Sequence, residues 1–242
     1  MNKNQRIIGI WGYPHPDILK KARETHPAHK ITDLDINAGF PSSNILPDTC
    51  CKIIMNIIDN AVWLKDSIDF IIASVGEEKC DSARLISIIL KDMGFKIIQT
   101  TYTTYNNEIY TPISVSNMPL KDKICKIMDK IINPVFLETR ECKPTFGFWG
   151  VPPNDMSILE LFPDATHVFG WTRCVEAKRP ADIDLEMFVD ESVPTVFFAQ
   201  TFCAKMQTAK YLARKYDGLY VDIDDKASNS VKAKIEAFIK LS

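Results

Sequence analysis

Apolar runs and segments with helical spacing alternate along the chain, and two stretches of this pattern read alike. The first is IIGIWGYPHPDILKKA at residues 7–22, and the second is TFGFWGVPPNDMSILELF at residues 145–162. Each has a β-prone run that ends in Gly-x-Trp-Gly, then a loop with proline and aspartate, then apolar residues spaced as in a helix. We therefore predict a strand, a tight turn at Gly12 or Gly150, and a helix in each stretch.

The likeness continues further along the chain. Residues 69–100 (DFIIASVGEEKCDSARLISIILKDMGFKIIQT) resemble residues 194–224 (PTVFFAQTFCAKMQTAKYLARKYDGLYVDID). Each segment predicts an apolar strand, a loop that carries a cysteine, a helix and a second strand. Gly94 and Gly218 stand where a glycine commonly follows the end of a helix.

Strands that alternate with helices of this length imply parallel sheets with right-handed crossover connections. Because the pattern occurs twice, we predict an α/β chain of two similar Rossmann-like lobes, each a doubly wound parallel sheet, with a cleft between them. The N-terminal lobe is predicted to span residues 1–120, a helical connector 121–142, and the C-terminal lobe 143–242. Ligands bind such sheets at the carboxyl ends of the strands.

Composition narrows the classes of function. A net charge of -2 over 242 residues gives no basic excess for extended nucleic-acid binding. The first apolar run is too short for a secretory signal, and no apolar stretch approaches the length of a membrane span, so we expect a cytoplasmic protein. Seven cysteines without a signal argue against a disulfide framework. Because the chain has no Cys-x-x-Cys pair, a metal site would have to draw its ligands from distant segments.

Three cysteines are predicted to lie where a strand ends or a helix begins, at the carboxyl edges of the two lobes: Cys51, Cys80 and Cys203. Cys51 falls in the first turn of a predicted helix, and Cys80 and Cys203 occupy equivalent positions in the repeat. Helix N-termini favour the thiolate form, which binds iron. The residues alone leave three interpretations open: buried thiols, a metal site between the lobes, or a nucleophilic cysteine.

The other four cysteines match this position at a strand end or helix start less well. Cys174 is predicted to end a strand of the second lobe and is a weaker candidate for the same edge. Cys125 has the spacing of a half-buried helix residue. Neither Cys50 nor Cys142 is assigned a role.

Several polar and aromatic residues are predicted near these loops. The repeated tryptophans, Trp11 and Trp149, are expected to pack between loop and helix. Charged side chains that could line the cleft are Glu77, Arg173, Glu176 and Lys178, with solvated surface charge as the simpler expectation.

The order of four motifs, LPDTCCKIIMNIID, VGEEKCDSARLI, VFGWTRCVEAK and VFFAQTFCAKMQTAKYL, resembles the 2-hydroxyacyl-CoA dehydratase/benzoyl-CoA reductase superfamily. The resemblance runs over most of the chain and lies in the order of the motifs more than in any one of them. It implies a 4Fe-4S cluster held by three cysteines, with the fourth iron open. The positions that match the ligands of the family are Cys51, Cys80 and Cys203.

The resemblance also implies an ATP-hydrolysing iron-sulfur activator that injects one low-potential electron, and a homodimer or a heterodimer with a related subunit. The expected function is an ATP-driven one-electron reduction or a radical dehydration. The chain departs from the family pattern in three respects. It is shorter than typical catalytic subunits, and residues 102–131 leave little room for the helical insertion that usually shapes an acyl-CoA pocket. It also has Val151 where relatives can carry cysteine.

Two alternatives remain, and the short length favours the first. One is a non-catalytic iron-sulfur subunit that relays electrons or assembles a metallocofactor for another protein. The other is a cluster-free α/β enzyme with one nucleophilic cysteine and a base nearby.

Overall fold

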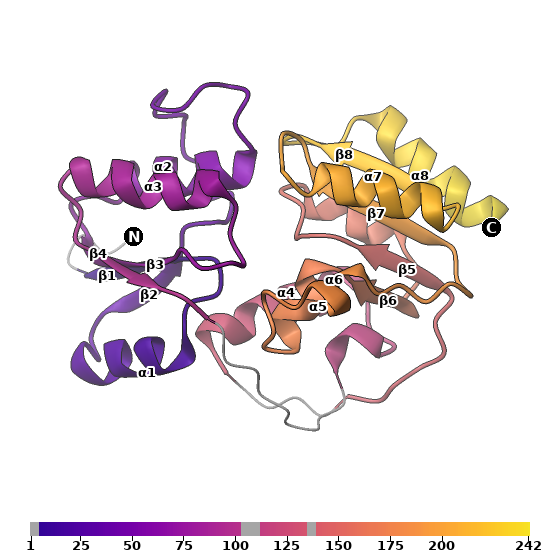
Figure 1. Cartoon of the computed structure of the whole chain (residues 1–242), viewed down its shortest axis with the longest axis horizontal. Helices are drawn as coiled ribbons and strands as arrows, with labels where there is room; N and C mark the ends of the chain where they lie inside the picture. Colours follow the sequence, from indigo (N-terminus) through magenta and orange to yellow (C-terminus); the bar gives the residue numbers. More distant parts are fainter. Residues whose placement is uncertain (1–4, 103–111, 135–138) are drawn as a thin grey trace. The chain divides into compact units, whose positions relative to one another are not determined.

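The computed structural model describes residues 5–102, 112–134 and 139–242, and it confirms the predicted α/β class (Figure 1). The contacts divide the chain into two compact units, a first unit from Met1 to Thr103 and a second from Thr104 to Ser242. Each unit contains a four-stranded sheet whose strands are all parallel.

The first unit has the strand order β2-β1-β3-β4. Its strands are β1 (Ile7–Trp11), β2 (Lys30–Asp33), β3 (Ile68–Ser74) and β4 (Ile97–Thr100). Its helices are α1 (Pro16–Thr25), α2 (Lys52–Trp63) and α3 (Asp81–Asp92). Helix α1 covers one face of the sheet, and α2 and α3 pack together on the other face (Figure 1).

Burial on both faces explains the sequence of this sheet. Every residue of β1 is buried, and β3 is buried except at Asp69, which is why both strands read as continuous apolar runs. The helices bury one stripe each, as Ala83, Ile86 and Leu90 do in α3. Gly94 follows α3 with φ 89°, as predicted for a glycine that ends a helix.

The second unit has the equivalent strand order β6-β5-β7-β8. Its strands are β5 (Phe146–Trp149), β6 (Thr166–Phe169), β7 (Thr195–Gln200) and β8 (Leu219–Ile223). Its α-helices are α4 (Leu120–Ile132), α5 (Trp171–Glu176), α6 (Ile183–Met187), α7 (Met206–Lys215) and α8 (Asn229–Leu241). Its described residues also include two 3-10 helices, η1 (Ile113–Val115) and η2 (Met156–Leu161).

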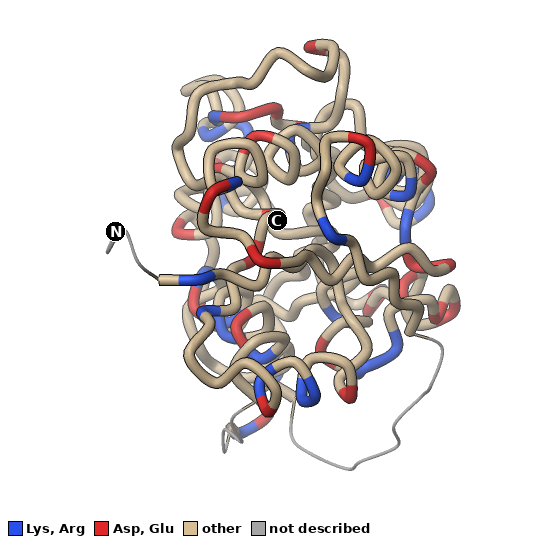
Figure 2. The backbone as a smooth tube through the Cα atoms, turned by 90° about the vertical axis from the view of Figure 1, so that its left-hand side faces the viewer, with Lys and Arg blue, Asp and Glu red and all other residues tan. Residues whose placement is uncertain are grey.

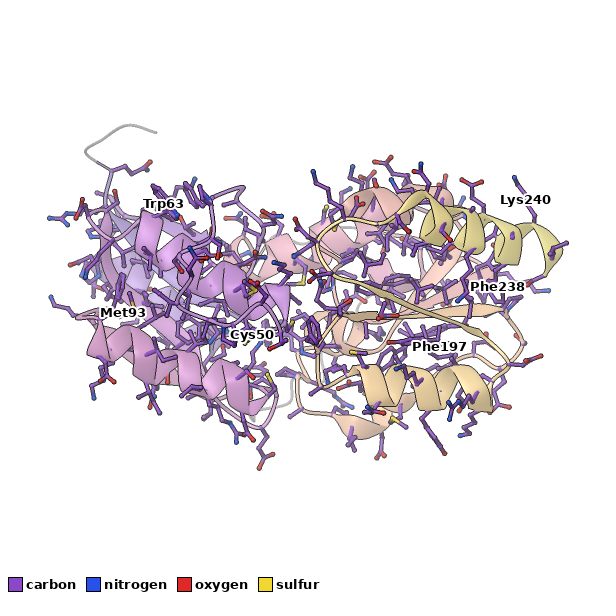
Figure 3. The ribbon with its side chains drawn as sticks, turned by 90° about the horizontal axis from the view of Figure 1, so that it is seen from above. Cys50, Trp63, Met93, Phe197, Phe238 and Lys240 are labelled. Atoms are coloured by element: carbon purple, nitrogen blue, oxygen red, sulfur yellow. The ribbon has the colours of Figure 1, made fainter. Side chains whose placement is uncertain are left out.

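Aromatic side chains fill the core on both faces of the second sheet. On one face Phe148 stacks on Phe198 and meets Phe162 edge to face. On the other face Phe197 lies between the sheet and α7 (Figure 3). There it contacts Trp149 and stacks on Tyr216. These buried rings fix the strands whose carboxyl ends carry the candidate site.

The second unit departs from the predicted pattern in two places. The segment after Gly150 forms only the six-residue η2, where a longer helix was predicted, because Pro163 follows almost at once. At the end of α7 the left-handed residue is Asp217 (φ 49°), and Gly218 comes after it. A Cβ on Gly218 would overlap the carbonyl oxygen of Thr195, so close approach explains this glycine.

Helix α4 falls in the predicted connector and belongs to the second unit, where it packs on α5, η1 and η2. Acidic and basic positions are interspersed along the chain, without a long block of one sign (Figure 2). Among the described residues no helix has the length and apolar character needed to cross a membrane.

Candidate functional site at the carboxyl edges of the two sheets

The strand order of the first unit creates a switch point between β1 and β3. The loop after β1 leads to α1 on one face, and the loop after β3 leads to α3 on the other face (Figure 1). Two loops that diverge in this way leave room for a ligand at the carboxyl ends of the strands. Residues 12–15 and 75–80 form these loops in the first unit.

Two of the predicted ligands lie at this edge as N-cap residues. Cys51 is the N-cap of α2 and is buried, and Cys80 is the N-cap of α3 and is exposed. Neither sulfur accepts a capping hydrogen bond from its helix. Serine, threonine, aspartate and asparagine are the usual residues at this position. At these two helix starts a thiol therefore replaces the side-chain oxygen that normally accepts a hydrogen bond from a backbone N–H of the first turn.

Cys51 lies one residue before the predicted position, since it precedes α2 and the first turn follows it. Its carbonyl accepts the hydrogen bond from Met55 N at 3.0 Å that opens the helix. The partial positive charge of a helix N-terminus stabilises a thiolate at such a position.

A lysine and two aspartates gather at this edge of the first sheet. The backbone N–H of Gly12 donates to Asp35 Oδ2 at 2.8 Å, and Asp35 N donates to Asp33 Oδ1 at 2.9 Å. Gly12 has φ +70°, and a Cβ there would overlap Cε and Nζ of Lys79. The Lys79 side chain therefore lies over Gly12, within electrostatic reach of both carboxylates.

The two carboxyl groups hold protons more strongly than aspartates in water. Burial raises the pKa of Asp33 to about 8, and the Asp35 carboxylate adds to the rise, while Lys79 opposes it. Burial also raises the pKa of Asp35, against the effects of Lys79 and of the Gly12 N–H. The positive charge of Lys79 does not offset the cost of burying two carboxylates, so the aspartate pair retains a proton near neutral pH.

The third predicted ligand lies at the equivalent edge of the second unit. Cys203 is partly exposed in the turn between β7 and α7, where its N–H donates to Gln200 O at 3.0 Å. It precedes α7 by three residues, whereas Cys80 directly precedes α3. Its neighbour Phe202 has φ 62°, which is uncommon for a bulky residue, and is 51% exposed.

A lysine and a carboxylate also meet at this second edge. Lys205, the N-cap residue of α7, pairs with Glu186 of α6. Trp149 at the end of β5 donates its indole N–H to the carbonyl of Glu186 at 2.7 Å. Trp11 in the first unit likewise donates to Ser74 O at 3.2 Å, and both tryptophans are buried, as expected for packing residues.

Two cysteines lie in other surroundings than the sequence suggested. Cys174 is within α5, because Gly170 (φ 74°) turns the chain straight from β6 into that helix. Burial, followed by the charges of Glu186 and Asp182, raises the pKa of the Cys174 thiol to about 12, so it is a poor thiolate ligand. Cys125 is exposed on α4, where the buried stripe passes through Lys123 and Ile124 instead.

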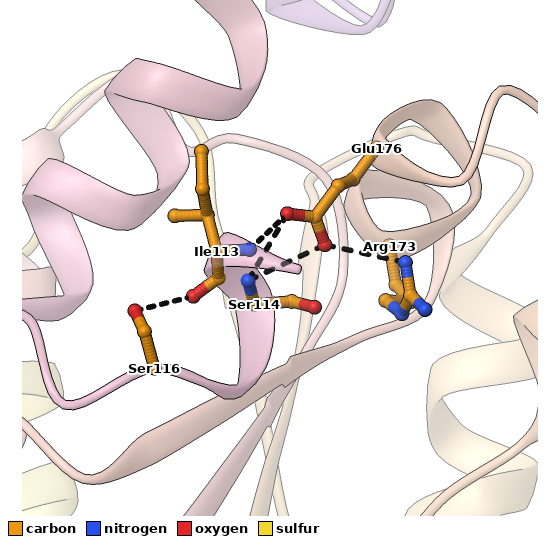
Figure 4. Close-up of polar contacts among 5 residues, drawn as sticks. All are labelled: Ile113, Ser114, Ser116, Arg173 and Glu176. Carbon is orange, nitrogen blue, oxygen red and sulfur yellow. Dashed lines mark hydrogen bonds and ion pairs between the residues drawn. The ribbon is translucent and has the colours of Figure 1, made fainter. Parts of the chain in front are cut away.

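Two charged residues proposed to line the cleft have a structural role in the second unit. The Glu176 carboxylate is buried and accepts backbone N–H bonds from Ile113 and Ser114 (Figure 4). Arg173 pairs with it at 3.2 Å. These bonds hold η1 against α5, so we assign Glu176 to folding and no longer to ligand binding. Glu77 is exposed, and Lys178 has φ 57° just after α5.

Sequence reasoning missed the group formed by Asp33, Asp35 and Lys79. A signal for it was present, since residues 33 and 35 are two apart at the end of a strand and so point to the same side. Their partner Lys79 is distant in sequence, and only the strand order brings it to them.

No group of three or more histidine, cysteine or acidic side chains placed to hold a metal ion occurs within residues 5–102, 112–134 and 139–242. Of the predicted ligands, Cys51 and Cys80 belong to the first unit and Cys203 to the second. The donor chemistry of the three thiols fits an iron-sulfur cluster. No protein-family model and no curated protein matches the sequence.

Proposed function

We propose that the chain is an iron-sulfur protein that holds a 4Fe-4S cluster through Cys51, Cys80 and Cys203. The observation that supports this most is the pair of cysteine N-caps, Cys51 and Cys80, at the carboxyl edge of one parallel sheet. Cys203 occupies the loop of the second unit that corresponds to the loop of Cys80. The resemblance to 2-hydroxyacyl-CoA dehydratases and benzoyl-CoA reductases selects the same three residues.

When bound, the cluster would supply a low-potential carrier for one electron. The residues of the chain would prepare its ligands. Cys51 and Cys80 stand at the N-termini of α2 and α3, where the backbone N–H groups of the first turn have no partner within the helix. Lys79, next to Cys80, adds a positive charge that lowers the cost of gathering negative charge at this edge. The Lys79 side chain lies over Gly12, where a residue with a Cβ would displace it.

The proposal extends to the partners and the reaction that the resemblance implies. An ATP-dependent iron-sulfur activator would deliver single low-potential electrons. The reaction would be an ATP-driven reduction or a radical dehydration, carried out with a second copy or a related subunit.

The test is anaerobic reconstitution of the full chain with iron and sulfide, followed by counting both per chain. We expect about four irons in the wild type. Cys51→Ser, Cys80→Ser and Cys203→Ser should each lose iron, and Cys125→Ser, an exposed cysteine on α4, serves as the matched control. A folded wild-type chain that binds no iron would leave the alternative of a nucleophilic cysteine.

A further inference from the structure

Three strand ends of the first unit bring polar side chains together at the switch point between β1 and β3. Gly12 follows β1, Asp33 is the last residue of β2, and Ser74 is the last residue of β3. The three strands are parallel neighbours, so these ends share one edge of the sheet. Ser74 faces Gly12 from β3, because its Cβ lies 3.0 Å from the position that a Cβ on Gly12 would take.

Two side-chain oxygens around Gly12 have no hydrogen-bond partner within the described residues. One is Ser74 Oγ, on a residue that is 0% exposed. The other is Asp35 Oδ1, which is buried, while Asp35 Oδ2 accepts the Gly12 N–H. Buried polar atoms are normally hydrogen-bonded, and an exception calls for an explanation. Two such oxygens around one glycine indicate hydrogen-bonding capacity that is available to a ligand.

The groups at this switch point can both accept and donate hydrogen bonds. Carboxylate oxygens accept, the Ser74 hydroxyl does either, and the ammonium of Lys79 has N–H donors within electrostatic reach of Asp33 and Asp35. The aspartate pair retains a proton near neutral pH, which adds a donor. A matching ligand must donate and accept at adjacent atoms. A vicinal diol does so, since each hydroxyl has one O–H and two lone pairs.

A cationic ligand matches this switch point less well than a neutral one. Lys79 already places a positive charge beside the two carboxyl groups. No set of three acidic, histidine or cysteine side chains suited to a metal ion occurs in the part of the chain that the structure describes. Asp33 and Asp35 remain partly exposed, so a neutral ligand can reach the carboxyl groups from solvent.

The start of α1, which follows the Gly12 turn, has little capacity for a phosphate group. The helix begins at Pro16, which has no N–H, and Asp17 N donates to His15 Nδ1 at 3.3 Å. Ile18 N donates to His15 O at 3.0 Å. The Asp17 carboxylate is 88% exposed and adds negative charge at the same helix start. The expected ligand therefore presents hydroxyl groups here and not a phosphate.

We propose that this edge of the first unit binds a ribonucleoside through the 2′- and 3′-hydroxyls of its ribose. In dinucleotide-binding folds, an acidic residue about 20 residues beyond the first glycine turn holds the ribose. Asp33 and Asp35 follow Gly12 at about that distance. One hydroxyl donates to Asp35 Oδ1 and the other pairs with Ser74 Oγ, while the flexible Lys79 side chain moves aside to admit the sugar. The site uses none of the proposed cluster ligands and does not depend on the cluster.

The experiment is isothermal titration calorimetry of the full chain with adenosine, guanosine, cytidine and uridine. For a ribonucleoside that binds, the 2′-deoxy form should bind about 10–100-fold more weakly, the loss typical of a hydrogen bond to a charged group. The 5′-monophosphate should bind no more tightly than the nucleoside, because the start of α1 offers it no free N–H. Free ribose, which lacks the base, should bind more weakly.

Ser74→Ala is the most direct variant, because Ser74 Oγ makes no hydrogen bond with the described residues and its removal breaks none of theirs. It should weaken binding about 3–10-fold. Asp35→Asn keeps an acceptor for the Gly12 N–H and should weaken binding about 10–100-fold. The matched control is Asp69→Asn, near the amino end of β3 in the same sheet, which should bind as the wild type does.

Four results would overturn the proposal. None of the four ribonucleosides binds, or the 2′-deoxy form binds as tightly as its parent. Folded Ser74→Ala and Asp35→Asn both keep the wild-type affinity. A monophosphate that binds far more tightly than its nucleoside would show that phosphate contacts dominate. Ribose that binds as tightly as the nucleoside would assign the diol to a free sugar.

Discussion

Removing the Glu176 carboxylate tests how the second unit holds η1. The side chain is 1% exposed and accepts hydrogen bonds from Ile113 N and from Ser114 N, the latter at 3.2 and 3.3 Å to its two oxygens. Both donor residues are completely buried. Glu176→Ala would leave their two N–H groups without an acceptor, and Arg173 without its ion pair.

The expected loss follows from these contacts. Each buried N–H left unsatisfied costs about 1–3 kcal/mol. Breaking a buried charged group of this kind costs about 3–5 kcal/mol in total, so we expect a loss of that size for Glu176→Ala. Glu176→Gln keeps one acceptor oxygen and loses the charge, so its loss should be about half as large.

Urea unfolding of the full chain, followed by circular dichroism, measures this loss in the transition of the second unit. Hydrogen exchange at Ile113 and Ser114 should quicken in the same variants. The control is Glu160→Ala, which removes an exposed carboxylate paired with Lys121 in the same unit and should leave the transition unchanged. A loss below about 1 kcal/mol for Glu176→Ala, as is usual for surface changes, would refute the anchoring role.

Three further predictions concern the strands and the first edge. The pKa of Asp33 is raised from 3.8 to about 8 in the folded chain, so its contribution to stability is full below pH about 4 and is lost as pH rises through 8. Asp33→Asn should flatten this decline in urea midpoints measured from pH 5 to 8. An unchanged slope would contradict the prediction. Gly12→Ala should destabilise the first unit by about 1–3 kcal/mol, since φ is +70° and the new Cβ overlaps Lys79. Gly39→Ala is the control, because Gly39 also has a positive φ but has open space around it. The difference between the two variants gives the cost of the overlap alone. Phe197→Ala should lower the free energy of unfolding by about 3–5 kcal/mol in thermal or urea unfolding, because the ring is fully buried between β7 and α7. A loss as small as that of a surface substitution would show that the ring does not support the core.

The fold could be predicted from the sequence because its strands are buried on both faces. Ile68–Ser74 and Thr195–Gln200 read as apolar runs, and the helices between strands show single buried stripes. The order of strands within each sheet could not be read in this way. Proline at residue 163 was a signal that the helix after Gly150 would be short.

Residues of the candidate site could be predicted only where a short stretch of sequence fixes their position. Cys51 and Cys80 were found because helix starts are marked in the sequence. Cys174 was misplaced because Gly170 turns the chain without a loop. Lys123 could not be recognised as buried, since a lysine at helical spacing is usually exposed, and here two carbonyl oxygens receive its ammonium group.

The cluster that we propose takes cysteines from both units, and Cys203 is the ligand that tests this sharing. The measurement is spin quantitation by EPR on the reconstituted, reduced full chain, compared between wild type, Cys203→Ser and Cys125→Ser. We expect the cluster signal in the wild type and in Cys125→Ser, and its loss in Cys203→Ser. An undiminished signal in folded Cys203→Ser, or no signal in a folded, iron-treated wild type, would contradict the claim.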